Sequence, residues 1–339
     1  MQNDKKRDVI FKIENLQKWF PVKRTMSEVF SGEKRFVKAV DGVSFDIMRG
    51  EIFGLVGESG CGKTTTGKLI MKLLDPTGGK IIFNGKDSTH LDKNDLKDYR
   101  ERVQMIFQDP YASMNPRFRI KDVLEEVLII HKKGNDKKER LEMVEKALSE
   151  VRLQPPHEYM ERFPHMLSGG QRQRAATARS LILNPLMIVA DEPVSMIDLS
   201  TRAEILHMMK TVQRELGLTY LYITHDLSTA RYFTDKIAVM YLGKIVEMGT
   251  PDEVIDNPLH PYTQALISAV CEPIAGKVNR IKEVPIKGEV PNATDIPEGC
   301  RFHTRCPYTG EVCEKGEDPL IQDDGGEHFV ACFKYKNLK

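Results

Sequence analysis

Long hydrophobic segments are lacking in this chain of 339 residues. The uncharged run Ser180–Ala190 has 11 residues and contains Pro185, whereas a helix that spans a bilayer needs about 20 apolar residues. The first residues, Met1–Asp8, are mostly polar or charged and lack the apolar stretch of a signal peptide. We therefore expect a cytoplasmic protein with no membrane-spanning segment of its own.

An excess of charge of one sign is also absent. The chain has 50 Lys and Arg against 49 Asp and Glu, which gives a formal net charge of +1. Partners such as nucleic acids and anionic membrane surfaces usually require a clear basic excess. The charge balance therefore predicts no nucleic-acid partner, although a local basic patch would remain compatible with it.

Closely paired cysteines are missing as well, because none of the six cysteines forms a C-x-x-C pair. In a reducing compartment these thiols are expected to be free, metal-bound or reactive rather than disulfide-bonded. The composition is that of an ordinary soluble protein, with 40% hydrophobic and 29% charged residues. At about 150 residues per domain, the length predicts roughly two domains.

A glycine-rich stretch after the apolar run 51–56 fits the phosphate-binding pattern G-x-x-x-x-G-K-[ST] at every required position. The pattern consists of Gly57, Glu58, Ser59, Gly60, Cys61, Gly62, Lys63 and Thr64, and Thr65 opens the helical run that follows. Glycines let successive backbone N–H groups and the helix N-terminus converge on an anionic phosphate. Lys63 is then expected to reach the terminal phosphates, and the Thr64 hydroxyl to ligate Mg²⁺.

Apolar runs alternate with helical patterns along the rest of the chain, which predicts an α/β sheet. Strands are expected at Val9–Ile13, Val37–Ile47, Lys80–Phe83, Val103–Phe107, Leu186–Ala190 and Tyr220–Ile223, with two more within Ile237–Val246. Helices are expected at Thr65–Leu74, Arg172–Leu183 and Thr201–Leu216, and a helical insertion from Pro110 to Met166. Polar residues follow several strands, so the site is expected along that edge of the sheet.

The acidic pair Asp191-Glu192 directly follows one of these buried runs. In this position Asp191 is suited to hold Mg²⁺ and Glu192 to activate the attacking water as general base. A second candidate anion-binding loop, Ser168-Gly169-Gly170-Gln171, opens another helix. The alternative for this second loop is an ordinary capped surface helix.

These motifs together make the chain resemble the nucleotide-binding subunit of an ABC transporter. Gly57–Thr64 is similar to the first Walker motif, Leu186–Glu192 to the second and Leu167–Gln171 to the ABC signature. The resemblance implies a P-loop ATPase that binds ATP and Mg²⁺. It further assigns Gln108 as the Q-loop glutamine, a residue that also approaches Mg²⁺. Asp198 is then the D-loop aspartate, and His225 is the switch histidine. The segment Ser195-Met-Ile-Asp198 departs from the usual S-A-L-D but retains the aspartate.

An aromatic residue stacks on adenine in this family. The aromatic residues Trp19, Phe20 and Phe36 lie upstream of the phosphate loop, although side chains beside strands commonly serve packing instead. The resemblance aligns the stacking residue with Phe20, and Phe36 is the alternative.

Further segments resemble the oligopeptide/dipeptide importer group, notably Asp41–Phe45, Gln108–Pro116, Asn257–Tyr262 and the cysteine-bearing tail. The resemblance implies an ATPase domain over residues 1–249, with a helical subdomain at about 110–170, and a C-terminal region at 250–339. It implies a second ATPase subunit as partner, commonly a different chain but alternatively a second copy. Two transmembrane permease subunits and an extracytoplasmic solute-binding protein would complete the complex at the cytoplasmic face of the membrane.

Two other functions compete with this interpretation. A cytosolic ABC-type ATPase acting on DNA or ribosomes usually carries a very long coiled-coil insertion or two cassettes, and this chain has one copy of each motif. A nucleotide-binding regulatory module would not need Glu192 and His225.

The tail after about residue 249 is irregular and contains several prolines, and we interpret it as a separate appendage with four cysteines. Cys300, Cys306, Cys313 and Cys332 are separated by 5, 6 and 18 residues, which suggests a metal that holds the segment together. The residues alone leave zinc and iron–sulfur open, with His303 and His328 as possible substitute ligands. The family resemblance favours a [4Fe–4S] cluster over zinc, and unligated thiols are the remaining alternative. Cys271 is expected to be a packed hydrophobic residue.

Cys61 lies inside the phosphate loop near a helix N-terminus. There the local field is expected to favour the thiolate and lower the pKa of the thiol. The alternative is an inert small residue at a permissive position.

Overall fold

The computed structural model describes residues 8–22, 35–111, 113–269, 286–319, 322–323 and 327–337. These residues form two compact units, each assembled from separate stretches of the chain. The first contains residues 48–52 and 91–223, and the second contains residues 9–47, 53–90 and the residues from 224 onward. None of the helices among the described residues has the length and apolarity needed to cross a membrane.

The first unit is built on three parallel strands, β6 (Val103–Ile106), β7 (Met187–Asp191) and β8 (Thr219–Thr224), with β7 between the other two. Every residue of β7 and β8 is buried, as expected for strands covered on both faces. The strands that the sequence predicts at these three places are confirmed, and they are parallel. Since Gln108 lies shortly after β6, and Asp191 and Glu192 lie at the end of β7, these polar residues occupy one edge of the sheet.

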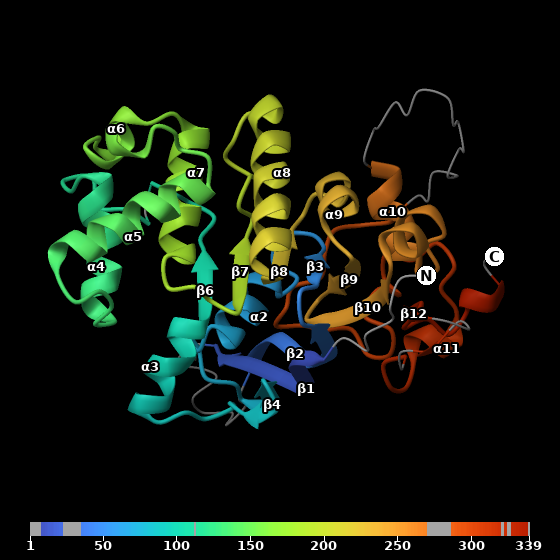
Figure 1. The fold of residues 1–339 in the computed structure, drawn as a ribbon. Coiled ribbons are helices and arrows are strands. Elements are labelled where there is room, and N and C mark those ends of the chain that lie inside the picture. Colours follow the sequence, from blue (N-terminus) through green and yellow to red (C-terminus); the bar gives the residue numbers. More distant parts are fainter. Residues whose placement is uncertain are drawn as a thin grey trace, which may run out of the picture. The chain divides into compact units, whose positions relative to one another are not determined.

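Helices make up the rest of the first unit. They are α3 (Lys93–Arg102), α4 (Ile120–Ile130), α5 (Lys137–Glu150), α6 (Pro156–Met160), the short η1 (Pro164–Met166), α7 (Gly169–Leu181) and α8 (Leu199–Leu216). Figure 1 shows α4, α5 and α6 grouped around α7. The predicted helical insertion is confirmed. Asp136 caps α5, because its carboxylate accepts the N–H of Glu139 at 2.8 Å.

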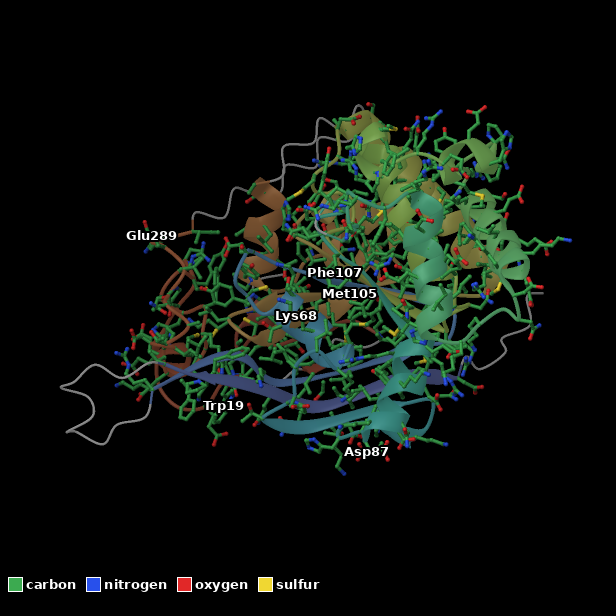
Figure 2. The ribbon with its side chains drawn as sticks, turned by 90° about the vertical axis from the view of Figure 1, so that its left-hand side faces the viewer. Trp19, Lys68, Asp87, Met105, Phe107 and Glu289 are labelled. Carbon is green, nitrogen blue, oxygen red and sulfur yellow. The ribbon has the colours of Figure 1, made fainter. Side chains whose placement is uncertain are left out.

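The second unit contains two groups of strands. The first is a four-stranded sheet in the order β2 (Phe36–Met48), β1 (Val9–Pro21), β4 (Gly78–Phe83) and β5 (Lys86–Asp87), in which Figure 2 labels Trp19 on β1 and Asp87 on β5. In the second group β3 (Ile52–Val56) pairs with β9 (Lys236–Tyr241), which pairs with β10 (Lys244–Gly249). The short β12 (Phe329–Val330) and β11 (Gln322–Asp323) follow β10.

Tight turns connect neighbouring strands of this unit. Asn84 and Gly85 between β4 and β5 have φ values of 50° and 77°, and Leu242 and Gly243 between β9 and β10 have φ values of 42° and 81°. Two consecutive positive φ angles are typical of the tight hairpin turn whose twist matches that of the strands. Helix α2 (Lys63–Ile70) ends four residues earlier than expected, because Lys72 adopts a left-handed φ of 54°.

The described tail residues do not form a unit of their own. They include η2 (Asp252–Asp256), α10 (Pro261–Ala269), α11 (Glu311–Glu314) and η3 (Tyr335–Asn337), and they belong to the second unit together with α9 (Leu227–Phe233). Tyr262 and Phe302 of the tail share one hydrophobic core with Val56 of β3 and Tyr241 of β9. The expectation of a separate appendage is therefore corrected. Side chains of the tail complete the hydrophobic core beside β3, the strand that leads into the phosphate loop.

Candidate functional site

The phosphate loop connects β3 with α2 in the second unit, as predicted. Gly57 and Gly62 adopt φ values of 153° and 111°. A Cβ atom at Gly57 would lie 2.3 Å from the carbonyl oxygen of Met240, and one at Gly62 would lie 2.2 Å from that of Ala39. Both positions therefore require glycine, because the backbone of the loop closely approaches other strands of its unit.

Lys63, the first residue of α2, folds back across this loop. Its side chain is 4% exposed, and its ammonium donates hydrogen bonds to the carbonyl oxygens of Gly57 at 2.7 Å and Glu58 at 2.9 Å. Thr64 is exposed at the start of the same helix and Thr65 is half-buried. The loop thus presents a lysine charge and a helix N-terminus at one place, which is the arrangement that binds anionic phosphates.

The prediction for the thiol of Cys61 is wrong. Cys61 is 4% exposed, and burial raises its pKa, against the opposing effect of the Lys63 ammonium 3.7 Å from its sulfur. Withdrawal from water penalises the thiolate more strongly than the nearby positive charges favour it. The alternative of an inert, packed residue is the one that the structure supports.

In the first unit the structure brings together the predicted Q-loop glutamine and the predicted general base. The Gln108 side-chain amide donates a hydrogen bond to a Glu192 carboxylate oxygen at 3.1 Å. Glu192 has a left-handed φ of 47°, and its N–H is fixed to the carbonyl oxygen of Ile223 at 2.9 Å. Asp191, one residue earlier, is buried at the end of β7. This arrangement leaves the two carboxylates of the pair in different surroundings, which suits them to different tasks.

The second candidate anion loop is the capped start of α7. The Ser168 hydroxyl accepts the N–H of Gln171 at 3.2 Å, and the Gln171 side-chain oxygen accepts the N–H of Ser168 at 3.1 Å. A Cβ atom at Gly169 would meet nothing within 4 Å, whereas one at Gly170 would lie 2.5 Å from a Thr201 methyl carbon of α8. The reciprocal cap is present, and Gly169 leaves open space for a ligand.

Asp198 caps α8 in the same unit. Its carboxylate accepts hydrogen bonds from the hydroxyls of Thr201 at 2.6 Å and Ser200 at 2.7 Å and from the N–H of Thr201 at 3.1 Å. These bonds lower the pKa of Asp198 to about 2. The carboxylate therefore remains ionised at neutral pH.

His225 and the candidate adenine-stacking residues belong to the second unit. His225 is exposed after β8. Phe20 is half-buried with the Lys18 ammonium 5.2 Å from its ring centre, whereas Phe36 packs at 6.3 Å from the ring of Trp19. The choice of Phe20 over Phe36 for stacking stays a prediction.

Sequence reasoning missed the residues that hold the phosphate loop from the tail. Arg305 binds the Glu58 carboxylate through both terminal nitrogens, at 2.9 and 3.3 Å, and the Tyr262 hydroxyl accepts the N–H of Glu58 at 2.9 Å. An acidic residue within an anion-binding loop was the available signal, because such a charge needs a cationic partner. The partner itself lies 247 positions away, so no local pattern identifies it.

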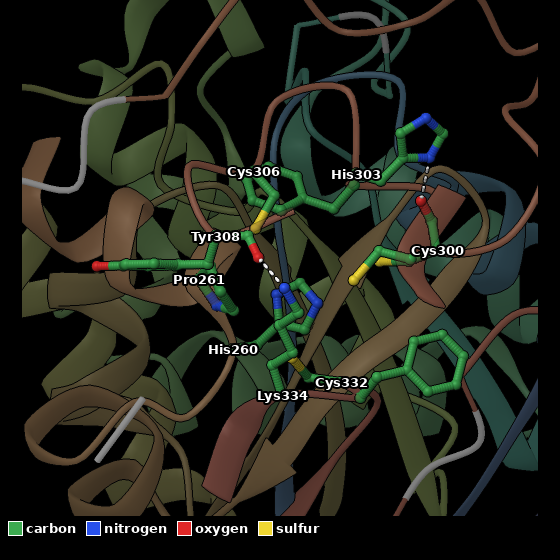
Figure 3. Close-up of a pocket in the computed structure, with 11 residues that line it drawn as sticks. His260, Pro261, Cys300, His303, Cys306, Tyr308, Cys332 and Lys334 are labelled. Atoms are coloured by element: carbon green, nitrogen blue, oxygen red, sulfur yellow. Dashed lines mark hydrogen bonds between the residues drawn. The ribbon is translucent and has the colours of Figure 1, made fainter. Parts of the chain in front are cut away.

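The four tail cysteines line a single pocket, shown in Figure 3. Burial, together with the neighbouring thiols Cys332, Cys313 and Cys306, raises the pKa of Cys300 to about 12. Among the described residues, no group of three or more His, Cys, Asp or Glu side chains is arranged so that it could hold a metal ion. The four thiols share one pocket, but the side chains as placed do not form a metal ligand set.

The two histidines considered as substitute ligands differ in position. His303 lines the pocket, and its Nδ1 lies 2.9 Å from the carbonyl oxygen of Cys300. His328 instead lies 2.8 Å from the carboxylate of the fully buried Glu247, which also accepts the N–H groups of Leu259 and His260. His328 is therefore engaged elsewhere. Cys271 lies outside the described residues.

Comparisons with known proteins agree along nearly the whole chain. Residues 40–195 match the model of the ABC transporter family, and residues 246–313 match that of the oligopeptide/dipeptide transporter C-terminal region. The chain is 45% identical to the oligopeptide transport ATP-binding protein AppF of Bacillus subtilis, over 97% of this chain and 98% of that protein. It is 44% identical to the dipeptide transport ATP-binding protein DppF of Escherichia coli, over 94% of this chain and 92% of that protein.

Solved structures agree with the fold. The ATP-binding cassette MJ0796, described as a dimer in a post-hydrolysis state bound to ADP and phosphate, is 28% identical with a TM-score of 0.61, over 71% of this chain and 98% of that chain. CbiO1 of Clostridium perfringens, described as part of the ABC transporter complex cbiONQ, is 26% identical with a TM-score of 0.63, over 74% of this chain and 92% of that chain.

Proposed function

Because this chain belongs to the ATP-binding proteins of the ABC transporter family, with the oligopeptide/dipeptide transporter C-terminal region, we propose that it hydrolyses ATP to power the import of oligopeptides, dipeptides or a related solute. The observation that carries this proposal is the 45% identity with an oligopeptide transport ATP-binding protein over 97% of the chain. The presence of both family regions in one chain disfavours a cytosolic ATPase that acts outside transport.

We assign roles to the site residues from their chemistry and from the family resemblance. The backbone of the loop Gly57–Thr65 and the Lys63 ammonium would hold the phosphates, while Phe20 would stack on the adenine. Thr64, Gln108 and Asp191 would hold Mg²⁺, which would supply positive charge to neutralise the phosphates. Glu192 would accept the proton of the attacking water, and His225 would orient the terminal phosphate. The hydrogen bond from Gln108 to Glu192 supports this assignment because it orients the carboxylate.

The remaining residues would complete the site of a partner ATPase subunit. Ser168, Gly169, Gly170, Gln171 and Asp198 carry the signature and D-loop roles in the family resemblance, in which two subunits enclose two ATP molecules. The description of the MJ0796 cassette as a dimer supports such an arrangement. We propose pairing with a different ATPase subunit, with two permease subunits and with a solute-binding protein across the membrane. The chain would then be a peripheral protein at the cytoplasmic face.

The domain limits also remain part of this proposal. The family matches at residues 40–195 and 246–313 support an ATPase domain over 1–249, with its helical subdomain at about 110–170, and a C-terminal region over 250–339. This division follows the family regions, whereas the packing places the described tail in the second unit.

The proposal is tested by co-expressing this chain with an ATPase subunit, two permease subunits and a binding protein encoded in the same genome, and purifying the complex in nanodiscs. We expect the complex to hydrolyse ATP faster when the binding protein carries a peptide than when it is empty. ATP turnover that does not respond to any peptide would contradict the peptide substrate. A chain that does not associate with permeases would contradict the transport function.

For the tail, we propose that Cys300, Cys306, Cys313 and Cys332 bind a [4Fe–4S] cluster, with zinc as the alternative. The convergence of all four thiols on one pocket supports this, and a cluster of this type is held by four cysteine thiolates. Such a cluster would have a structural role, since ATP hydrolysis needs no redox step. Because ligation requires thiolates and the pKa of Cys300 is raised to about 12, binding is expected to release protons.

Anaerobically purified protein is expected to be brown and to contain about four irons per chain. Cys306→Ser should lose the colour, whereas Cys271→Ser, a control at a cysteine that is not one of the four proposed ligands, should keep it. Colourless protein with one zinc per chain would favour the alternative, and protein without metal would contradict both.

A further inference from the structure

The phosphate loop carries a negative charge of its own, at Glu58. Its side chain is 30% exposed and follows Gly57 at the start of the loop. A carboxylate beside bound phosphates would repel them, because like charges at close range disfavour each other. A loop that binds ATP therefore has to neutralise this carboxylate or direct it elsewhere.

Arg305 of the tail provides the neutralising charge. Its guanidinium binds both Glu58 carboxylate oxygens, at 2.9 and 3.3 Å. The arginine side chain is only 8% exposed, and its guanidinium carbon lies 5.8 Å from the ring centre of Tyr241 and 5.9 Å from that of Phe302. A two-point arginine–carboxylate pair that is packed against aromatic rings is stronger and better defined than a surface ion pair.

The backbone of Glu58 is held by the tail as well. The hydroxyl of Tyr262 accepts the N–H of Glu58 at 2.9 Å. Tyr262 is fully buried, and its ring centre lies 4.7 Å from that of Tyr241 and 5.5 Å from that of Phe302. Main chain and side chain of the same loop residue are therefore both anchored to residues of the tail.

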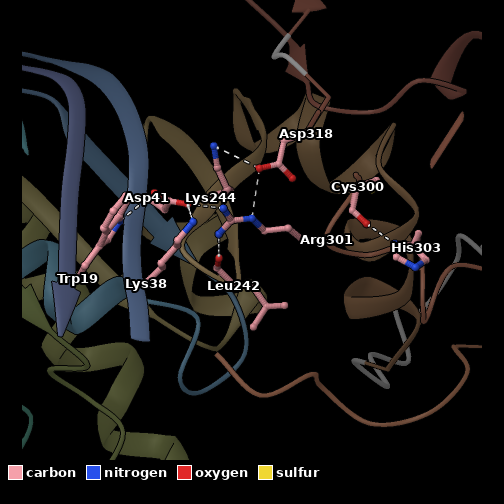
Figure 4. Close-up of polar contacts among 9 residues, drawn as sticks. All are labelled: Trp19, Lys38, Asp41, Leu242, Lys244, Cys300, Arg301, His303 and Asp318. Carbon is pink, nitrogen blue, oxygen red and sulfur yellow. Dashed lines mark hydrogen bonds and ion pairs between the residues drawn. The ribbon is translucent and has the colours of Figure 1, made fainter. Parts of the chain in front are cut away.

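A neighbouring contact fixes the other end of the loop. The N–H of Gly243, in the turn between β9 and β10, donates to the carbonyl oxygen of Cys61 at 2.8 Å. Figure 4 shows Arg301 of the tail binding this turn through the carbonyl oxygen of Leu242, at 2.5 Å, and also binding Asp41 and Asp318. Arg301 and Arg305 lie on the one turn bounded by Cys300 and Cys306.

From these contacts we propose that Arg305 and Tyr262 are positioning residues for ATP binding: together they neutralise and immobilise Glu58 so that the phosphate loop accepts the phosphates. This inference rests on the proposed ATPase function and adds two residues to it that lie outside the nucleotide motifs. It also assigns the C-terminal region a role in positioning the phosphate loop of its own chain.

The test measures the Kd and KM for Mg-ATP and the kcat of the full chain in its complex, for wild type and Arg305→Met. Methionine retains the packing of the arginine stem but removes the charge. We expect ATP binding to weaken about tenfold, as for the loss of one charge-assisted interaction. The kcat at saturating ATP should stay nearly unchanged, because Arg305 contacts no reacting group.

The second variant decides between electrostatic positioning and general stability. Adding Glu58→Gln to Arg305→Met removes the unpaired negative charge, so ATP affinity should return to near the wild-type value. A merely structural arginine would leave the double variant as weak as Arg305→Met. The matched control is Arg231→Met, which breaks another two-point pair of this unit, to Asp256 at 2.8 and 2.8 Å, without affecting the loop.

If Arg305→Met does not fold, Tyr262→Phe tests the same proposal, because it removes only the hydroxyl that accepts the Glu58 N–H. We expect it to weaken ATP binding several-fold without loss of kcat. Wild-type affinity in both Arg305→Met and Tyr262→Phe, or a double variant that is not rescued, would overturn the inference. These outcomes differ from a failure of the proposed function itself, in which wild type would not bind ATP.

Discussion

Replacing Glu192 with glutamine is expected to lower ATP turnover by about 10²–10⁴-fold, the usual contribution of a general base, while ATP still binds. The amide retains the size of the side chain and a hydrogen-bonding oxygen for the Gln108 amide, now 3.1 Å from the carboxylate, but it cannot take a proton from water. The left-handed backbone at Glu192, with φ of 47°, also remains, so the local geometry is preserved.

The measurement is steady-state ATP hydrolysis by the purified complex together with equilibrium binding of Mg-ATP. Glu204→Gln is the matched control: Glu204 is an exposed residue of α8 whose contact with Arg174 spans 3.5 Å, and such surface pairs contribute little. Control turnover should equal that of wild type. Turnover near the wild-type rate in Glu192→Gln would remove Glu192 from the role of base.

Replacing Lys63 with alanine is expected to weaken ATP binding itself, by roughly 10- to 100-fold, which corresponds to the loss of hydrogen bonds to a charged group. The lysine ammonium already bonds two loop carbonyl oxygens, at 2.7 and 2.9 Å. The substitution therefore removes both the positive charge available to the phosphates and a cross-link within the loop. Turnover falls as a consequence, because less nucleotide is bound.

Two further variants separate charge from packing. Lys63→Met fills most of the volume of the buried lysine stem, so an equal loss of ATP affinity in Lys63→Met and Lys63→Ala would assign the effect to the charge. Lys68→Ala removes an exposed lysine from the same helix and should leave affinity unchanged. Unchanged ATP affinity in Lys63→Met, measured by calorimetry, would contradict the role of Lys63.

Features that depend on neighbouring residues in the chain were predictable. The glycine positions of the phosphate loop and the two short strands expected within Ile237–Val246 agree with the structure. Each of these features depends on φ angles or hydrogen bonds within a few residues, so it can be predicted from a short stretch of sequence. The buried parallel strands β7 and β8 were equally clear, since continuous apolar runs indicate a sheet covered on both faces.

The errors concern properties that arise from packing. The helix N-terminus beside Cys61 is visible in the sequence, but its burial is not, and burial reverses the direction of the pKa shift. The tail looked like an appendage because it is irregular and contains proline. Its aromatic residues Tyr262 and Phe302 nevertheless complete the core that includes Val56, immediately before the phosphate loop.

The amino-acid sequence by itself determined the nucleotide motifs and the family of this protein, because phosphate binding depends on a short loop whose glycines, lysine and threonine have to be consecutive. The tertiary structure alone decided that Arg305 neutralises Glu58, that Tyr262 holds its backbone, and that four dispersed cysteines share one pocket. The physical reason is distance along the chain. An ion pair between residues 247 positions apart forms only when folding brings its two charges together, so the spacing of residues in the sequence does not predict it.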